Sequence, residues 1–348
     1  MKVDSFSLPL SSPLATARET ISQRSGFVVR YDHRGETGVG EATPLPGWTE
    51  SLDDCQRGLN DAATVAADGG HTDVLLSLDA ASVPAARHGF ATALLDADAR
   101  ADGVPLYQWF DSERHCNRVP VNATVGDGSP AETADAVERA VEAGYDCCKL
   151  KVGKRTVDED VARVRTVRER VGDDVTLRAD ANGAWSRDRA QDAVDRLAPL
   201  DVAYVEQPLP ADDLTGHAEL RGSGVGVALD ESLVDRRVDS VLDADAADVL
   251  ILKPMVLGGP GNAHTLALRA REQGVEPVVT TTIDAVVARL AALHVAAAIP
   301  DVAACGLATG DRLAADLAPD PTTVTDGAMS VPQSTGLGID PTEVGTDA

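Results

Sequence analysis

From about residue 119 the sequence alternates between short apolar runs and helical stretches, and this rhythm restricts the fold more than any other feature. The runs recur roughly every 25 residues, and between them apolar side chains return at helical spacing. Strands that alternate with helices predict a parallel βα array, and eight such strands predict a TIM-type barrel. The runs are Val119–Val125, Cys147–Val152, Val175–Ala179, Val202–Val205, Val225–Leu229, Val249–Leu252, Pro277–Thr282 and Val302–Leu307.

An open, doubly wound sheet is the alternative arrangement of the same units. Such sheets often carry a glycine-rich phosphate-binding turn after a strand, but no GxGxxG or P-loop pattern follows any of the runs. We therefore expect an α/β barrel over residues 116-312.

The first 115 residues predict a smaller α+β module. Phe27–Tyr31 and Gly38–Ala42 are strand-like and flank the polar turn His33–Glu36, which predicts a hairpin. Two helices are expected near 50–67 and 86–102. Residues 313-348 are rich in Pro, Asp and Thr, and we expect them to return and cover this module.

The net charge of −25 disfavours nucleic acid and anionic membranes as partners, because both are negatively charged. No apolar stretch is long enough to cross a membrane, and the N-terminus lacks the apolar core of a signal peptide, so we expect a cytoplasmic protein. The acidic, lysine-poor composition is typical of proteins that work in concentrated salt, the halophilic type. Scattered cysteines and histidines give no disulfide framework or zinc pattern.

Only five lysines occur in the chain, and two of them end the second run, as Lys149 and Lys151. Side chains at positions i and i+2 of a strand share a face, so both are expected to point into the mouth of the barrel. Arginine can replace lysine on a surface but cannot act as a proton-transfer base, because its pKa stays above about 12. Two retained lysines at a strand end therefore indicate chemistry.

Acidic residues end the next three runs at matching positions. Asp180, Glu206 and Asp230 are separated by 26 and 24 residues, about one βα unit each, and Lys253 ends the following run. Three carboxylates at one level of a barrel mouth predict a site for Mg²⁺, with Mn²⁺ as the alternative metal. The same strand parity places Arg178 and Asn182 on the face of Asp180.

In this order the motifs resemble the enolase superfamily, in the branch related to muconate lactonizing enzyme, and the resemblance covers nearly the whole chain. Within that branch, the Pro44–Trp48 segment and Arg178 are most similar to the o-succinylbenzoate synthases. The matching motifs are KxK (Lys149, Lys151), DxN (Asp180, Asn182), EQP (Glu206 to Pro208), DES (Asp230 to Ser232) and KP (Lys253, Pro254).

The resemblance implies a (β/α)7β barrel with an α+β lid, and a Mg²⁺-dependent hydro-lyase that serves menaquinone biosynthesis. Its substrate would be a small carboxylate, 2-succinyl-6-hydroxy-2,4-cyclohexadiene-1-carboxylate, and a homo-oligomer is allowed but not required. In the implied site Lys151 is the base and Lys149 and Lys253 assist. Asp180, Glu206 and Asp230 hold the metal, and Glu231 is expected to support Lys253 or Asp230 rather than to bind the metal. The expected substrate contacts are Arg178, Asn182, Thr281 and Trp48.

The same residues bear on several related activities. The seventh run ends without the histidine of the mandelate racemase branch, and Thr309-Gly310-Asp311 departs from the DxD of the dipeptide epimerases, which disfavours both. N-acylamino acid racemases and muconate-type cycloisomerases share all five motifs and stay open as alternatives. An alternative of another class is a non-catalytic barrel that only binds a ligand.

Overall fold

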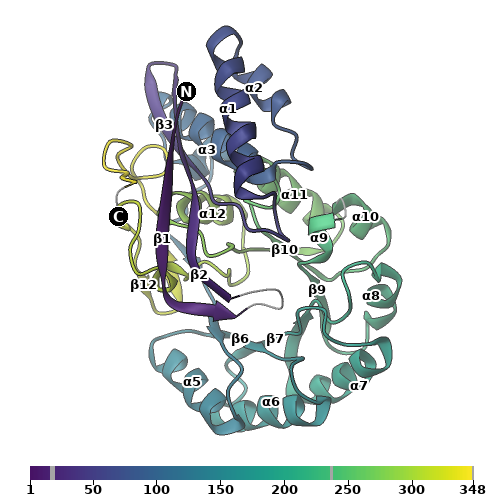
Figure 1. Ribbon diagram of the computed structural model, residues 1–348. Helices are drawn as coiled ribbons and strands as arrows, with labels where there is room; N and C mark the ends of the chain where they lie inside the picture. Colours follow the sequence, from purple (N-terminus) through teal and green to yellow (C-terminus); the bar gives the residue numbers. More distant parts are fainter. Residues whose placement is uncertain (16–19, 236–237, 347–348) are drawn as a thin grey trace.

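The computed structural model describes residues 1–15, 20–235 and 238–346. An antiparallel sheet near the N-terminus lies beside a curled parallel sheet whose helices form an outer layer (Figure 1). No helix among these described residues is long and apolar enough to cross a membrane.

The N-terminal sheet has the order β1 (Lys2–Ala15), β2 (Thr20–His33) and β3 (Glu36–Ala42). The expected hairpin is present as β2 and β3, whereas β1 was not predicted. Helix α3 (Pro84–Ala101) packs on β3 at very short range, since a Cβ atom at Gly40 would lie only 1.9 Å from the carbonyl oxygen of Gly89. Helices α1 (Leu52–Asp68), α2 (His71–Ser77) and α4 (Leu106–Phe110) complete this part of the chain.

The parallel sheet contains seven strands in the order β11-β10-β9-β8-β7-β6-β5. Six of the predicted runs appear in it nearly as expected, and the first run is divided between β4 and β5. The strands are β4 (Arg118–Pro120), which lies outside this sheet, and β5 (Ala123–Val125), β6 (Cys147–Lys151), β7 (Thr176–Asp180), β8 (Val202–Glu206), β9 (Gly226–Leu229), β10 (Val249–Leu252) and β11 (Glu276–Val279).

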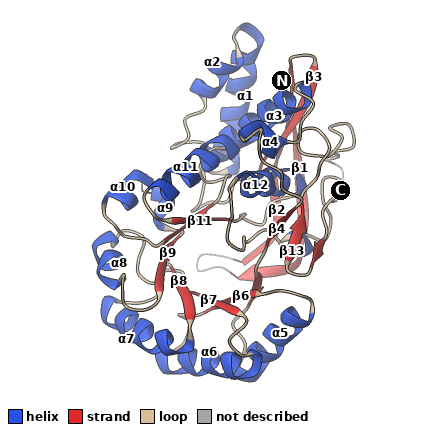
Figure 2. Cartoon of the chain, turned by 180° about the vertical axis from the view of Figure 1, so that it is seen from behind, coloured by secondary structure: helices blue, strands red, loops and turns tan. Residues whose placement is uncertain are grey.

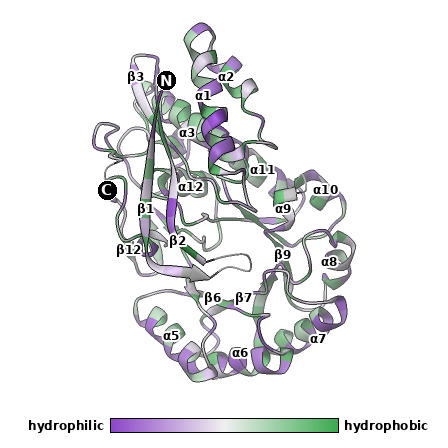
Figure 3. Ribbon diagram, in the orientation of Figure 1, coloured by the Kyte–Doolittle hydropathy of each residue, from purple (hydrophilic) through white to green (hydrophobic). Residues whose placement is uncertain are grey.

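Helices cover the outside of the curled sheet (Figure 2). Along α5, α6 and α7 hydrophilic and hydrophobic residues stand side by side, as expected for helices with one face on the sheet and one in water (Figure 3). These outer helices are α5 (Pro130–Glu142), α6 (Val157–Val171), α7 (Arg187–Leu197), α8 (Leu214–Leu220), α9 (Ser232–Asp235), α10 (Val238–Asp243) and α11 (Pro260–Glu272).

The eighth predicted run, Val302–Leu307, is not a strand, which corrects the sequence-based expectation. It instead forms two isolated bridges, one to each edge of the parallel sheet. Cys305 N donates to Pro120 O at 2.8 Å, and Gly306 N donates to Val279 O at 2.9 Å. The residues between β4 and β5 and the residue that follows β11 are thus linked through a single short segment, which is too brief to count as a strand.

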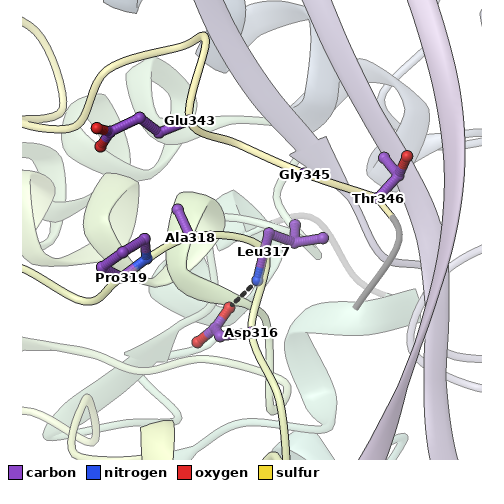
Figure 4. Close-up of a pocket in the computed structure, with 7 residues that line it drawn as sticks. All are labelled: Asp316, Leu317, Ala318, Pro319, Glu343, Gly345 and Thr346. Carbon is purple, nitrogen blue, oxygen red and sulfur yellow. Dashed lines mark hydrogen bonds between the residues drawn. The ribbon is translucent and has the colours of Figure 1, made fainter.

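The C-terminal segment lies against the N-terminal module. Strands β12 (Val324–Thr325) and β13 (Ala328–Ser330) form a small sheet with β4. Farther along, Leu337 N donates to the buried carboxylate of Asp96 on α3 at 2.7 Å. A pocket of about 430 Å³ lies along Asp316–Pro319 and residues 343–346 of this segment (Figure 4), and it contains none of the predicted site residues.

Helix α12 (Val286–Ala298) lies between the N-terminal module and the parallel sheet, and every residue in it is buried. A carboxylate from the module caps its N-terminus, because Glu41 accepts hydrogen bonds from Ala285 N and Ala288 N, both at 2.9 Å. Burial, and after it the nearby Asp284, raise the pKa of Glu41 from its ordinary 4.5 to about 7.

This raised pKa makes the stability of the protein depend on pH. Between pH 4.5 and about 7 the Glu41 carboxyl is ionised in the unfolded chain but still protonated in the folded one. The unfolded state then binds fewer protons, so the Glu41 contribution falls as pH rises through this window, by roughly 3 kcal/mol in all. We expect the free energy of unfolding of wild type, minus that of Glu41→Gln, to fall between pH 5 and pH 8 in urea titrations. A difference that stays flat would contradict a protonated Glu41.

Candidate active site

The strand register brings the predicted acidic and basic side chains to one edge of the parallel sheet. Lys151 pairs with Asp180 across β6 and β7, and Asp180 pairs with Glu206 across β7 and β8. Asp230 and Lys253 directly follow the last residues of β9 and β10. The carboxyl ends of these five strands therefore carry the predicted array at one level, as parallel strands require.

Lys149 lies between two of the carboxylates. Its Nζ atom is 2.9 Å from both carboxylate oxygens of Glu206 and 3.3 Å from Oδ2 of Asp180. Burial lowers the pKa of Lys149, but Glu206 and Asp180 raise it more, so that it lies well above its ordinary value. Lys149 is accordingly a permanent cation at neutral pH, suited to stabilise negative charge and unsuited to accept a proton.

Lys151 faces the same carboxylate from the more open side. Its Nζ atom donates to Asp180 Oδ2 at 2.6 Å and to Asn182 Oδ1 at 2.9 Å. The side chain of Lys151 is 36% exposed, whereas that of Lys149 is 14% exposed. The amide of Asn182 in turn donates to Glu231 Oε1 at 3.0 Å, so Glu231 is joined to the array through Asn182.

A second ion pair lies across the array and beneath an aromatic ring. Lys253 Nζ donates to Asp230 Oδ2 at 2.6 Å, and both residues are buried. The same Nζ atom lies 3.4 Å from the centre of the Trp48 ring, close enough for a cation–π contact. Trp48 belongs to the N-terminal module, so the module covers this side of the strand ends.

The acidic groups differ in their affinity for protons. Burial raises the pKa of Glu206 to about 7, with Asp180 as the next cause. Burial also raises the pKa of Asp230 to about 6, against the opposing effect of Lys253. Burial would raise the pKa of Asp180 as well, but Lys149 and Lys151 outweigh it and hold that pKa below its ordinary value.

As the side chains lie, no three His, Cys, Asp or Glu groups within residues 1–15, 20–235 and 238–346 are arranged to hold a metal ion. Each carboxylate of the array instead faces a lysine ammonium group. The donor chemistry still fits a hard cation, because three buried carboxylates stand on successive strands and offer only oxygen. Cation binding would require Lys149, Lys151 and Lys253 to release these oxygens.

The other two predicted substrate contacts, Arg178 and Thr281, also have protein partners. Arg178 is buried, donates to Ala304 O at 2.6 Å and to Asn122 Oδ1 at 3.3 Å, and lies 4.8 Å from the centre of the Tyr204 ring. These contacts tie β7 to the segment that bridges the sheet edges. Thr281 shares a hydrogen bond of 3.1 Å with Thr309 and is also buried.

Gln207, the middle residue of the EQP motif, is a positioning residue to which the motif alone gave no role. It is fully buried, and its Oε1 atom accepts from Asp230 N and Ser232 N, both at 3.1 Å. Its Nε2 atom donates to Ser232 Oγ at 2.8 Å. The end of β8 thereby fixes the backbone that carries Asp230. The sequence signal for this role was that Gln207, an uncharged and bulky polar residue, directly follows the carboxylate Glu206 at the end of an apolar run.

Comparisons with known families match both parts of the chain. Residues 132–344 match the family described as Enolase C-terminal domain-like, and residues 1–97 match the family described as MenC, N-terminal domain.

Among curated relatives, the L-Ala-D/L-Glu epimerase of Bacillus subtilis (strain 168) is 30% identical over 347 residues, which cover 96% of this chain and 94% of the relative. Its substrate-liganded structure has a TM-score of 0.87, covering 100% of this chain and 98% of the other. The o-succinylbenzoate synthase of Thermobifida fusca (strain YX) is 40% identical over 219 residues, which cover 61% of this chain and 66% of the relative.

A dipeptide epimerase from Enterococcus faecalis V583, solved with Mg and the dipeptide L-Leu-L-Tyr, has a TM-score of 0.86 and 26% identity, covering 97% of this chain and 98% of the other. The epimerases that the eighth run disfavoured are thus among the relatives of this chain. The parallel half-barrel agrees with these solved structures.

Proposed function

The chain belongs to the enolase superfamily, and on that premise we propose that it is an o-succinylbenzoate synthase. The observation that carries the proposal is the ordered array of lysines and carboxylates at the ends of β6 to β10. The match of residues 1–97 to the MenC N-terminal domain and the 40% identity to a synthase support this choice among the reactions of the superfamily.

We propose the following division of the chain. Residues 1-115 form the lid, residues 116-312 form a (β/α)7β barrel, and residues 313-348 complete the lid. Asp180, Glu206 and Asp230 would hold Mg²⁺ between them. When bound, the metal would supply positive charge for the substrate carboxylate and for the negative charge that develops on it.

The shared chemical step is removal of a proton from the carbon next to that carboxylate. Lys151 is the proposed base, because its Nζ atom lies on the open side of Asp180 and its side chain is the more exposed of the two on β6. Lys149 would stay charged and stabilise the enediolate. Lys151 then returns its proton to the departing 6-hydroxyl group, which leaves as water and completes the aromatic ring.

Lys253 and Trp48 would face the forming ring from the other side. The ammonium group of Lys253 already contacts an aromatic face at 3.4 Å, which is the contact that an aromatic product would also offer. Trp48 would exclude water above it. Asn182 and Glu231 would orient Lys151. Arg178 and Thr281 would contact the substrate.

The test is a spectrophotometric assay with 2-succinyl-6-hydroxy-2,4-cyclohexadiene-1-carboxylate and Mg²⁺. We expect Mg²⁺-dependent loss of the diene absorbance, and no loss after chelation of the metal. Folded protein that binds Mg²⁺ but leaves the diene unchanged would refute the synthase proposal.

A racemase or epimerase is the second candidate, and the similarity to the Bacillus subtilis epimerase along 96% of this chain favours it. Lys151 and Lys253 approach the carboxylates from different strands, as a two-base racemisation needs. Incubation of N-succinyl amino acids or dipeptides in D₂O would reveal this activity as exchange of the α-proton and a change of optical rotation.

A further inference from the structure

Helix α6 carries a buried ion pair directly behind the end of β6. Arg163 Nη1 donates to Asp160 Oδ1 at 2.9 Å, and their side chains are 1% and 3% exposed. An arginine so deeply buried is costly unless its donors are used. Its remaining hydrogen bonds therefore indicate what the pair holds in place.

The other hydrogen bonds of Arg163 go to the hydroxyl of Thr133 on α5 and to two backbone carbonyls, one of which lies at the end of β6. Arg163 Nη1 also donates to the carbonyl oxygen of Lys151 at 3.0 Å, and Asp160 Oδ2 accepts from Gly153 N at 2.7 Å. The two side chains of the ion pair thus hydrogen-bond to the main chain on both sides of Val152. Arg163 Nη2 reaches Gly126 O at 3.2 Å, which ties the same point to the loop after β5.

The segment Lys151–Gly153 is also packed against the end of β7. Val152 N donates to Asp180 O at 2.9 Å. Gly153 has φ of +93°, and a Cβ atom there would lie 2.9 Å from both Ala181 O and the Ala184 Cβ. The backbone after Lys151 therefore has little freedom to shift relative to the strand that carries Asp180.

We propose that Arg163 and Asp160 are positioning residues that aim Lys151. This inference rests on the proposed function, in which Lys151 is the base. The Lys151 side chain is 36% exposed, so packing alone does not fix it. The position of its Nζ atom is set by where the Lys151 main chain lies and by Asp180 and Asn182, which accept its hydrogen bonds. A forked guanidinium can hold the Lys151 and Gly126 carbonyls together with the Asp160 carboxylate, which a lysine ammonium on a flexible stem cannot do.

The same helix offers a matched control. Arg168 is also buried and donates to four backbone carbonyls, of Gly172, Val175, Leu200 and Asp201, at 2.6–3.0 Å. These carbonyls precede β7 and β8, at the end of the sheet away from the array. Arg163→Lys and Arg168→Lys are therefore the same substitution at two buried arginines of one helix, and they release backbone at opposite ends of the sheet.

Both variants and wild type are compared by steady-state kinetics and by hydrogen–deuterium exchange at a temperature below every melting transition. For Arg163→Lys we expect kcat to fall by about 10²-fold with little change in KM, because a small misplacement of a catalytic group has this effect. The isotope effect with substrate deuterated at the abstracted position should rise. The peptide containing residues 151–156 should exchange faster than in wild type.

For Arg168→Lys we expect a lower melting temperature but kcat, isotope effect and exchange of that peptide close to wild type. Equal losses of kcat and equal exchange in the two variants would overturn the positioning role. If wild type shows no turnover, the proposed function is refuted, and the exchange data still decide whether Arg163 holds the segment.

Discussion

Replacement of Lys151 by alanine is expected to reduce turnover by about 10²- to 10⁴-fold, the usual contribution of a general acid or base. The ammonium group that contacts Asp180 at 2.6 Å is then absent, and Lys149, 3.3 Å from the same carboxylate oxygen, is held by Glu206. Mg²⁺ binding should persist, because Asp180, Glu206 and Asp230 are unchanged. Diene absorbance measures the first effect, and calorimetric titration with Mg²⁺ measures the second.

Lys154→Ala is the matched control for this variant. Lys154 lies three positions farther along the chain, its side chain is 72% exposed, and its nearest acidic partner, Asp127, is 3.9 Å away. It should lose neither turnover nor stability. Near-normal turnover in Lys151→Ala would show that the base has been assigned to the wrong residue.

Glu206→Gln is expected to abolish Mg²⁺-dependent turnover and to weaken Mg²⁺ binding by more than about 100-fold, which is the upper range for losing only an outer partner of a metal site. Glutamine keeps the shape of the side chain but removes the negative charge. Lys149 retains Asp180 at 3.3 Å, so its charge is not left unpaired. Titration calorimetry with Mg²⁺ is the direct measurement, with circular dichroism as the check on folding.

Glu231→Gln separates the proposed ligands from their neighbours. Glu231 contacts Asn182 at 3.0 Å and is proposed to stand outside the ligand set. We expect this variant to keep most of its Mg²⁺ affinity and to lose activity only in part. If Glu231→Gln lost the metal while Glu206→Gln kept it, the proposed ligand set would be wrong.

The sequence predicted those parts of the fold that repeat. Regular spacing identified the strands β6 to β11, because each βα unit carries its own apolar run. Strand β1 was missed, since Pro9 and Pro13 disfavour a strand by propensity and are tolerated only at an edge such as this one. The run at Val302–Leu307 has the composition of a strand, but only its central residues, at Cys305 and Gly306, bridge to the sheet edges.

The sequence was sufficient to predict which of the candidate side chains would come together, but not which contacts they would make. Strand parity and spacing were sufficient to place Lys151 beside Asp180, which the register shows as direct partners. They could not indicate that Lys149 would bond both oxygens of Glu206, because lysine side chains have many rotamers. The roles of Gln207 and Arg163 depend on hydrogen bonds between residues 12 to 37 positions apart, which a local pattern does not encode.

Helix α12 has a consequence for how such proteins can be recombined. The helix belongs by sequence to the barrel, but its N-terminus is closed by Glu41 of the N-terminal module. A chimera that took its first hundred residues from one relative and the remainder from another would inherit the two halves of this contact from different parents. Exchange of lids between relatives, as a route to new substrates, would therefore succeed only where β3 and the start of α12 are inherited together.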